Sequence, residues 1–107
     1  MKDTLRRVLG ELRERLTALY GNRLMRLVLY GSAARGDYDP EGSDIDVLVV
    51  LKGPVDAGEE IDRTSFIVAE LSLEHDVVIA CVFMDQDRFL HRQGPFLRNI
   101  RREGIAL

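Results

Sequence analysis

The chain has 107 residues and a formal net charge of −3, with 46% hydrophobic and 31% charged residues, so we expect one folded domain over residues 1–107. The acidic balance argues against a surface devoted to nucleic acid, and no apolar run approaches the roughly 20 residues that span a membrane. One cysteine cannot form an internal disulfide, and a charged stretch directly follows Met1, so we expect a cytoplasmic protein.

An amphipathic helix is predicted at the start of the chain. Asp3 or Thr4 can cap it, and Gly21 can end it. Glu11 and Arg15 can pair across one turn of its exposed face. Its apolar residues recur at steps of three and four and form a single stripe, made of Leu5, Val8, Leu9, Leu12, Leu16, Leu19 and Tyr20.

Three apolar segments follow that are typical of buried strands. They cover residues 24–30, 45–51 and 76–83. Gly31-Ser32 ends the first of these strands, and Gly53-Pro54 ends the second.

Helices are predicted around the third strand. Residues 56–73 form one of them, and its apolar side is expected to contain Ile61, Ile67, Val68 and Leu71. Asp85 can cap a short helix, and Pro95 can open a last helix through Arg102. The order helix–strand–turn–strand–helix–strand–helix predicts a small α/β protein, with helices packed on a sheet of three or slightly more strands.

Two carboxylates stand two residues apart at the start of the second strand. Asp44 and Asp46 project from the same face, because alternate residues of a strand point the same way, while Ile45 points into the core. Two acids so placed repel each other unless a cation lies between them. Mg²⁺ suits such a pair, because it binds a few carboxylates and completes its shell with water and phosphate oxygens.

A glycine turn beside this pair can hold an anion. Gly31 follows the first strand and lets the backbone approach a phosphate closely. A helical turn starting at Ser32 would direct its free N–H groups at that phosphate. Asp76 opens the predicted third strand and could supply a third carboxylate, which would hold a second ion and help activate an attacking hydroxyl. Alternatively, Asp76 only accepts backbone hydrogen bonds where the strand starts.

The string Gly31-Ser32-x-Ala34-Arg35-Gly36, followed by Ser43-Asp44-Ile45-Asp46, resembles the signature of the DNA polymerase beta superfamily. Within it, the chain is most similar to the minimal nucleotidyltransferases, short prokaryotic proteins that include antitoxins of the MntA type. The resemblance covers essentially the whole chain in length and element order. It implies the nucleotidyltransferase fold, with a mixed sheet packed with helices.

The resemblance also implies roles for individual residues. Gly31 and Ser32 would bind the phosphates of ATP, the nucleotide substrate. Asp44, Asp46 and Asp76 would be the catalytic residues and the ligands of two magnesium ions.

Two further residues of the motif are assigned to the nucleotide site. They are Ser43 and Arg35, and Arg35 could alternatively tether the loop. The stretch between Arg35 and Ser43 is one residue longer than the commonest form, with Gly42 as the extra residue. A loop absorbs one residue at small entropic cost, although the insertion could shift Ser43 and the start of the strand.

Relatives of this kind pair with a HEPN-domain protein as a toxin–antitoxin system. The resemblance therefore implies an enzyme that transfers AMP from Mg–ATP to a hydroxyl, in this case a tyrosine of a HEPN-type toxin, within a homo- or hetero-oligomer. The alternative is a catalytically weak binding module of the same fold that neutralises its partner by occlusion. Inhibition of the partner that persists without ATP would favour the module.

Another hypothesis concerns the acidic loop. Asp37, Asp39, Glu41 and Gly42 resemble the opening of an EF-hand calcium loop, but the twelfth position is Leu48 rather than glutamate and strands flank the loop. We therefore interpret the three acids as solvated loop residues. His75 and His91 have no metal-ligand spacing and are expected to be ordinary surface residues. A solvated face is also the expected place of Arg98, Arg101 and Arg102.

Overall fold

A four-stranded mixed sheet is the central layer of the computed structural model, which describes residues 2–107. The strand order is β3-β2-β1-β4. β1 is antiparallel to β2 and to β4, and β3 is parallel to β2. The strands are β1 (Leu24–Tyr30), β2 (Ile45–Leu51), β3 (Ile79–Asp85) and β4 (Ile105–Ala106). The predicted fold class is confirmed, and the short β4 is added to the three strands expected from the sequence.

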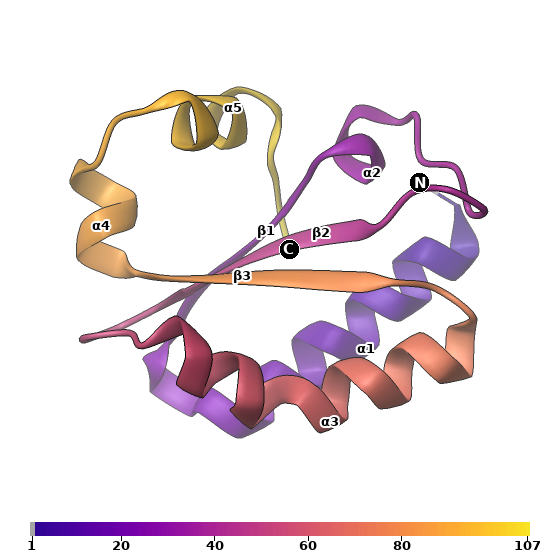
Figure 1. Ribbon diagram of the computed structural model, residues 1–107, viewed down its shortest axis with the longest axis horizontal. Helices are drawn as coiled ribbons and strands as arrows, with labels where there is room; N and C mark the ends of the chain where they lie inside the picture. The colour runs from indigo at the N-terminus through magenta and orange to yellow at the C-terminus, as the bar shows by residue number, and fades with distance from the viewer. Residues whose placement is uncertain (1) are drawn as a thin grey trace.

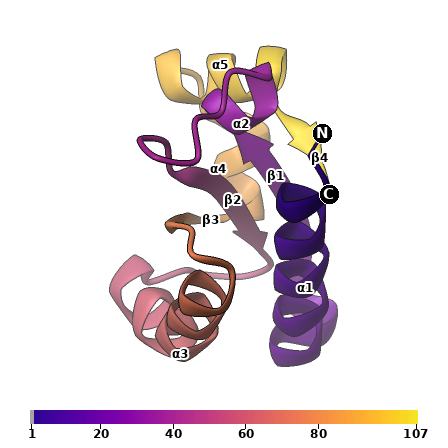
Figure 2. The same ribbon diagram turned by 90° about the vertical axis from the view of Figure 1, so that its right-hand side faces the viewer.

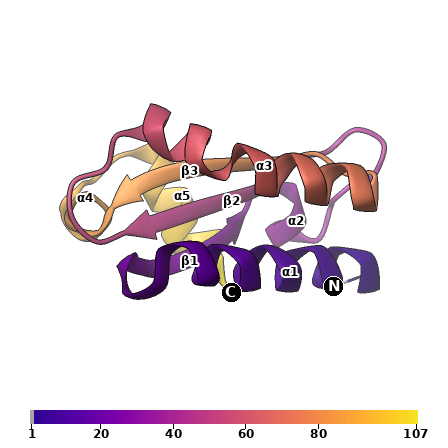
Figure 3. The same ribbon diagram turned by 90° about the horizontal axis from the view of Figure 1, so that it is seen from below.

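Helices cover both faces of this sheet. α1 and α3 lie side by side on one face, and α4 and α5 lie over the other, while α2 directly follows β1 (Figure 1; Figure 3). The helices are α1 (Asp3–Tyr20), the 3₁₀ turn η1 (Gly21–Arg23), α2 (Ser32–Arg35), α3 (Ala57–His75), α4 (Gln86–His91) and α5 (Pro95–Glu103). Within the described residues, no helix is long and apolar enough to span a membrane.

The central strand β2 separates two hydrophobic clusters. Its odd-numbered residues from Ile45 to Leu51 belong to the larger cluster, beneath α1 and α3. Leu48 and Val50 face the other way and form a smaller cluster with Val28 of β1 and Ile100 of α5. Because β2 is buried on both faces, its sequence after Asp46 is continuously apolar.

The first helix differs from the prediction at its start and on its exposed side. Its N-cap is Lys2, which makes no side-chain capping bond, so neither Asp3 nor Thr4 is the cap. The expected Glu11–Arg15 pair does not form, because α3 packs alongside and supplies other partners. Glu11 contacts His75, and Arg15 pairs with Glu70 at 2.5 Å. Of the predicted stripe, Leu19 is 41% exposed.

The buried side of α3 also differs from the prediction. Ile61 is 53% exposed, and Glu60 is buried in its place. Glu60 accepts hydrogen bonds from the Tyr20 hydroxyl at 2.7 Å and from Arg23 at 3.2 Å, and it also pairs with Arg63. Burial opposes the charge of this carboxyl, but the bonds from Tyr20 and Arg23 prevail and lower its pKa. A polar network therefore joins α1 to α3 where an apolar contact was expected.

The third strand starts later than predicted. α3 continues to His75, and Asp76 is its C-cap in the left-handed conformation, with φ of 53°. β3 then runs from Ile79 to Asp85 instead of from 76 to 83. His75 is also not the surface residue that was expected, because only 10% of its side chain is exposed where it contacts Glu11.

Candidate functional site

Asp44 and Asp46 lie where β2 begins, on the sheet face that carries Leu48 and Val50. Asp46 is paired across the sheet with Tyr30 of β1, and Ile45 between the acids is fully buried on the opposite face. Burial, and then the charge of Asp44, raise the pKa of Asp46 above its ordinary value. The two carboxylates are therefore close enough to repel each other, as expected for a pair that would share a cation.

The turn at Gly31 lies directly against Asp46. Gly31 has φ of 72° and ψ of −155°, a conformation that is essentially restricted to glycine. A Cβ added there would overlap a carboxylate oxygen of Asp46 and lie 3.3 Å from its Cγ. The glycine is thus required twice, for its backbone conformation and for the space that Asp46 occupies. The structure brings the predicted phosphate turn and the predicted metal ligand together.

The short helix α2 starts immediately after this glycine. Its hydrogen bonds begin with the N–H groups of Ala34 and Arg35, which both donate to the Gly31 carbonyl at 3.1 Å. The amides of Ser32 and Ala33 precede these bonds in the first turn of the helix. The first N–H groups of a helix have no partner within the helix and can donate to other acceptors. Ser32 therefore lies where the sequence expectation needs it, next to Gly31 and Asp46.

The loop between α2 and β2 is ordered by its own polar groups. The Ser43 hydroxyl accepts from the Asp39 N–H at 3.0 Å, and the Ser43 N–H donates to the Asp39 carbonyl at 2.8 Å. Gly42 donates to the same carbonyl at 3.2 Å, so the additional residue lies in a turn of the loop. Asp46 lies against Gly31 despite the additional residue, so the insertion does not separate this acid from the glycine turn. Ser43 shapes this loop.

Arg35 connects the loop to the C-terminal helix. Its guanidinium lies 3.6 Å from Asp37 and 3.6 Å from Glu103 of α5. These contacts are those of a tether, the alternative kept open from the sequence. The charge of Arg35 also lowers the pKa of Asp46, against the stronger effects of burial and Asp44.

Asp76 does not lie where the sequence places it. As the C-cap of α3 it is exposed and precedes β3, and it lines a pocket together with Ile45, which points away from the acid pair. The expectation that it opens the third strand is wrong, because α3 runs two residues further than its apolar pattern indicates and β3 begins only at Ile79. Its role as a third ligand stays a prediction.

One group of three potential metal ligands exists elsewhere among residues 2–107. Glu11, Glu74 and His75 place one ligand atom each within 4.8 Å of the others. They belong to α1 and α3, on the opposite face of the sheet from Asp46. The side-chain contact between His75 and Glu11 accounts for this group as a polar contact that joins the two helices. The EF-hand hypothesis is not supported, since the loop leads into the strand β2 where an EF-hand has a helix.

Aromatic residues that sequence reasoning missed adjoin the acids. Tyr30 lies opposite Asp46, and burial, followed by the charge of Asp46, raises its pKa. Phe96 of α5 contacts the Tyr30 ring edge-on, with the centroids 5.4 Å apart. The Tyr38 hydroxyl is buried without a hydrogen-bond partner in the described structure, and burial is the main cause that raises its pKa. No motif marks Phe96, because only the tertiary fold brings α5 to the end of β1 (Figure 2).

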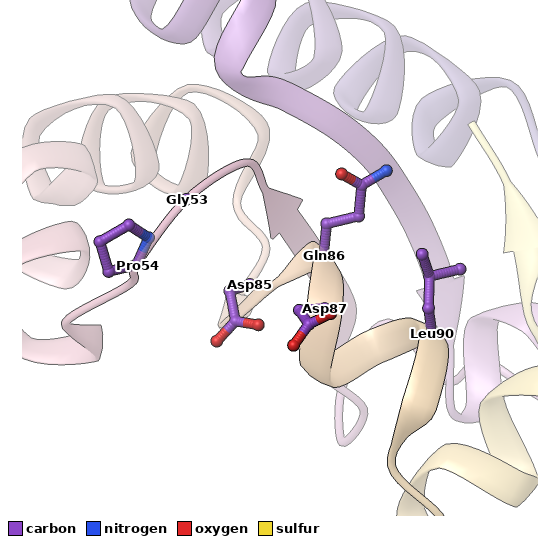
Figure 4. Close-up of a pocket in the computed structure, with 6 residues that line it drawn as sticks. All are labelled: Gly53, Pro54, Asp85, Gln86, Asp87 and Leu90. Atoms are coloured by element: carbon purple, nitrogen blue, oxygen red, sulfur yellow. The ribbon is translucent and has the colours of Figure 1, made fainter.

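A hollow at the other end of the sheet also carries acids. Asp85 and Asp87 line it with carboxylates that point to the same side (Figure 4), together with Gly53, Pro54, Gln86 and Leu90. The Asp85 carboxylate caps α4 by accepting from the Arg88 N–H at 2.7 Å. Because β2 and β3 are parallel, this hollow at the end of β3 is remote from the acids at the start of β2.

Comparison with known proteins gives consistent results. The family described as nucleotidyltransferase domain matches residues 5–106. The Methanocaldococcus jannaschii protein named "Putative protein adenylyltransferase MJ0604" is 38% identical over 93 residues, which cover 86% of each chain. A toxin–antitoxin crystal structure with AMP-PNP superposes with a TM-score of 0.61 at 17% identity, over 89% of this chain and 68% of the other. A structure of the toxin–antitoxin MntA-HpeT gives 0.58 at 14% identity, over 88% and 67%.

Proposed function

The chain belongs to the nucleotidyltransferase domain family and is a nucleotidyltransferase, and we propose that it transfers AMP from Mg–ATP to a hydroxyl group of a partner protein. The observation that carries this proposal is the contact between the Asp46 carboxylate and Gly31, with Asp44 alongside. It supports a site in which a metal-bound carboxylate and a phosphate turn serve the same nucleotide. The relative named for protein adenylylation supports AMP as the group transferred and a protein as the acceptor.

The proposed roles follow from the positions of the residues. The backbone at Gly31 and Ser32 holds the β and γ phosphates, because a glycine turn followed by helical N–H groups suits an anion. Asp44 and Asp46 hold two magnesium ions, which when bound neutralise the phosphate charge and fix the α phosphorus. The donor set fits this metal, since two mutually repelling carboxylates provide the oxygen ligands that Mg²⁺ prefers.

The transfer itself needs little covalent work from the protein. The acceptor oxygen forms a bond to the α phosphorus, the bond from that phosphorus to the pyrophosphate oxygen breaks, and the acceptor proton passes to a base. Asp76 is the proposed base and third ligand, on the short segment that leads from α3 into β3 beside β2. Arg35 and Ser43 act by holding the loop beside the nucleotide, Arg35 through its contact with Glu103 and Ser43 through its hydrogen bond with Asp39.

The proposed acceptor is a tyrosine of a HEPN-type toxin. This follows from the resemblance of the motif, and it is supported by the toxin–antitoxin proteins that share the fold. A module that only occludes its partner would not need two repelling acids beside a glycine turn, so the geometry favours the enzyme.

Incubation with labelled ATP, Mg²⁺ and a toxin encoded beside the chain tests the proposal. We expect the toxin to gain mass in units of AMP with the wild type, and to gain none with Asp44→Ala or Asp46→Ala. Asp62→Ala is the matched control, because Asp62 is an exposed acid on α3. Equal labelling by both site variants would refute the assignment, and inhibition of the toxin without ATP would favour occlusion.

A further inference from the structure

One exposed aromatic ring lies on the sheet face that carries Asp46, which we call the acid face. Within residues 2–107, the only exposed aromatic residues are Phe66 and Phe96. Phe66 belongs to α3, which lies on the opposite face. Phe96 belongs to α5, which packs on the acid face through Ile100. Because Phe96 is 40% exposed, part of its ring is accessible to a ligand.

The Phe96 ring adjoins the predicted nucleotide site through Tyr30. The two rings meet edge-on, with their centroids 5.4 Å apart and their planes at 88°. Tyr30 directly precedes Gly31 and is paired across the sheet with Asp46. A single side chain, that of Tyr30, therefore connects Phe96 to the glycine turn and to the acid at the start of β2.

A second contact connects α5 to the helix that follows the glycine turn. Glu103, at the end of α5, lies 3.6 Å from Arg35 of α2, where the two helices lie next to each other (Figure 2). Phe96 and Glu103 are about two helical turns apart, so they lie on the same side of α5. This side meets Tyr30 at one end and α2 at the other. α5 is therefore a wall of the predicted nucleotide site.

The proposed function, on which this step rests, leaves the nucleoside of ATP without a binding surface. In that function the β and γ phosphates lie at Gly31 and Ser32, and the α phosphorus lies at Asp44 and Asp46. The sheet closes the site below, and the acceptor hydroxyl needs the side opposite the leaving pyrophosphate. The nucleoside therefore extends away from the sheet, toward the layer in which α5 lies. Nucleobases stack on exposed aromatic side chains, because every base has a flat π face.

We propose that Phe96 stacks on the base of ATP and makes the site selective for purine nucleotides. The contact with Tyr30 limits the movement of the Phe96 ring before the nucleotide binds, which lowers the entropic cost of stacking. A purine has a larger ring surface than a pyrimidine and stacks more strongly on an aromatic side chain. Phe96 therefore favours ATP over UTP, while the glycine turn and the acids bind the triphosphate of either nucleotide.

Calorimetric titration with Mg–ATP, Mg–UTP and magnesium tripolyphosphate, which has no nucleoside, tests this inference. Phe96→Ala should raise the Kd for Mg–ATP about tenfold or more and leave the Kd for tripolyphosphate unchanged. Phe96→Leu keeps apolar bulk against Tyr30 but has no ring, so it should weaken Mg–ATP binding in the same way and abolish the preference for ATP over UTP. Phe66→Ala is the matched control, since Phe66 is 70% exposed on α3 and lies on the opposite face.

The outcomes separate the base site from the phosphate site. An unchanged Kd for Mg–ATP in Phe96→Ala or in Phe96→Leu would overturn the inference. An equal loss of affinity for ATP and tripolyphosphate would also overturn it, because the substitution would then act through the glycine turn. If the wild type binds ATP, UTP and tripolyphosphate equally well, the phosphate site stands and the inference is overturned. If the wild type binds none of the three, the proposed function itself fails, and the inference fails with it.

Discussion

Replacement of Gly31 by alanine should disrupt the site through two separable effects. The first is backbone strain, because φ of 72° with ψ of −155° costs an L-residue about 1–3 kcal/mol. The second is the overlap of the new Cβ with the Asp46 carboxylate, which resembles overpacking and costs about 1–3 kcal/mol more. Gly31→Ala should therefore lower the free energy of unfolding by about 2–6 kcal/mol.

Gly36→Ala provides the control for a positive φ without a neighbouring carboxylate, in the less strained left-handed region with ψ of 8°. Gly36 also has a positive φ, of 86°, but an added Cβ there meets nothing within 4 Å. Urea denaturation of both variants should show that Gly31→Ala is the more destabilising. In addition, Asp46→Ala introduced into the Gly31→Ala chain should recover part of the loss, because it removes the carboxylate that the new Cβ meets. If Gly31→Ala is no worse than Gly36→Ala, or if the second substitution recovers nothing, Asp46 does not lie against Gly31.

Three further predictions concern the charges. Because the pKa of Asp46 is raised in the folded protein, ionisation of this carboxyl lowers the stability of the fold as pH rises through the raised pKa. Asp46→Asn should therefore raise the melting temperature at pH 7 in the absence of metal. Mg²⁺ should raise the melting temperature of the wild type only. Glu60→Ala should lower the free energy of unfolding in urea by about 2–4 kcal/mol. Because the pKa of Glu60 is lowered from 4.5 in the folded protein, its ionised form stabilises the fold above pH 4.5, and this stabilisation should be lost as pH falls through the lowered pKa. Arg35→Ala should lower the free energy of unfolding by less than about 1 kcal/mol, because the ion pairs of Arg35 are exposed. It should also raise the pKa of Asp46 further in an NMR titration, because it removes the positive charge that lowers this pKa. An unchanged Asp46 pKa would contradict the prediction.

The sheet and the acid pair could be predicted because local patterns determine them. β1 and β2 have the predicted bounds, since continuous apolar runs between glycine turns are typical of strands buried on both faces. Because side chains alternate along a strand and Ile45 is buried, Asp44 and Asp46 lie on the opposite face of the sheet. The placement of Gly31 against Asp46 needs in addition the antiparallel pairing of β1 and β2, which brings the end of one to the start of the other and which no local pattern predicts.

The remaining features depend on packing that no local pattern records. Asp76 was misplaced because the end of α3 is set by its contact with α1, where His75 meets Glu11. The apolar pattern predicts that Ile61 is buried, but Glu60 is buried instead. Its carboxylate is satisfied by Tyr20 of α1, Arg23 of η1 and Arg63 of α3, which the pattern does not record. Phe96 reaches the site only because α5 returns across the sheet, far along the chain from β1.

A crystal structure of the chain with Mg²⁺ and a non-hydrolysable ATP analogue tests the central claim most directly. We expect the β and γ phosphates against the Gly31 turn and the metal on the carboxylates of Asp44 and Asp46. A nucleotide bound in the hollow beside Asp85, or a metal held by Glu11 and His75 with none at Asp46, would contradict the account.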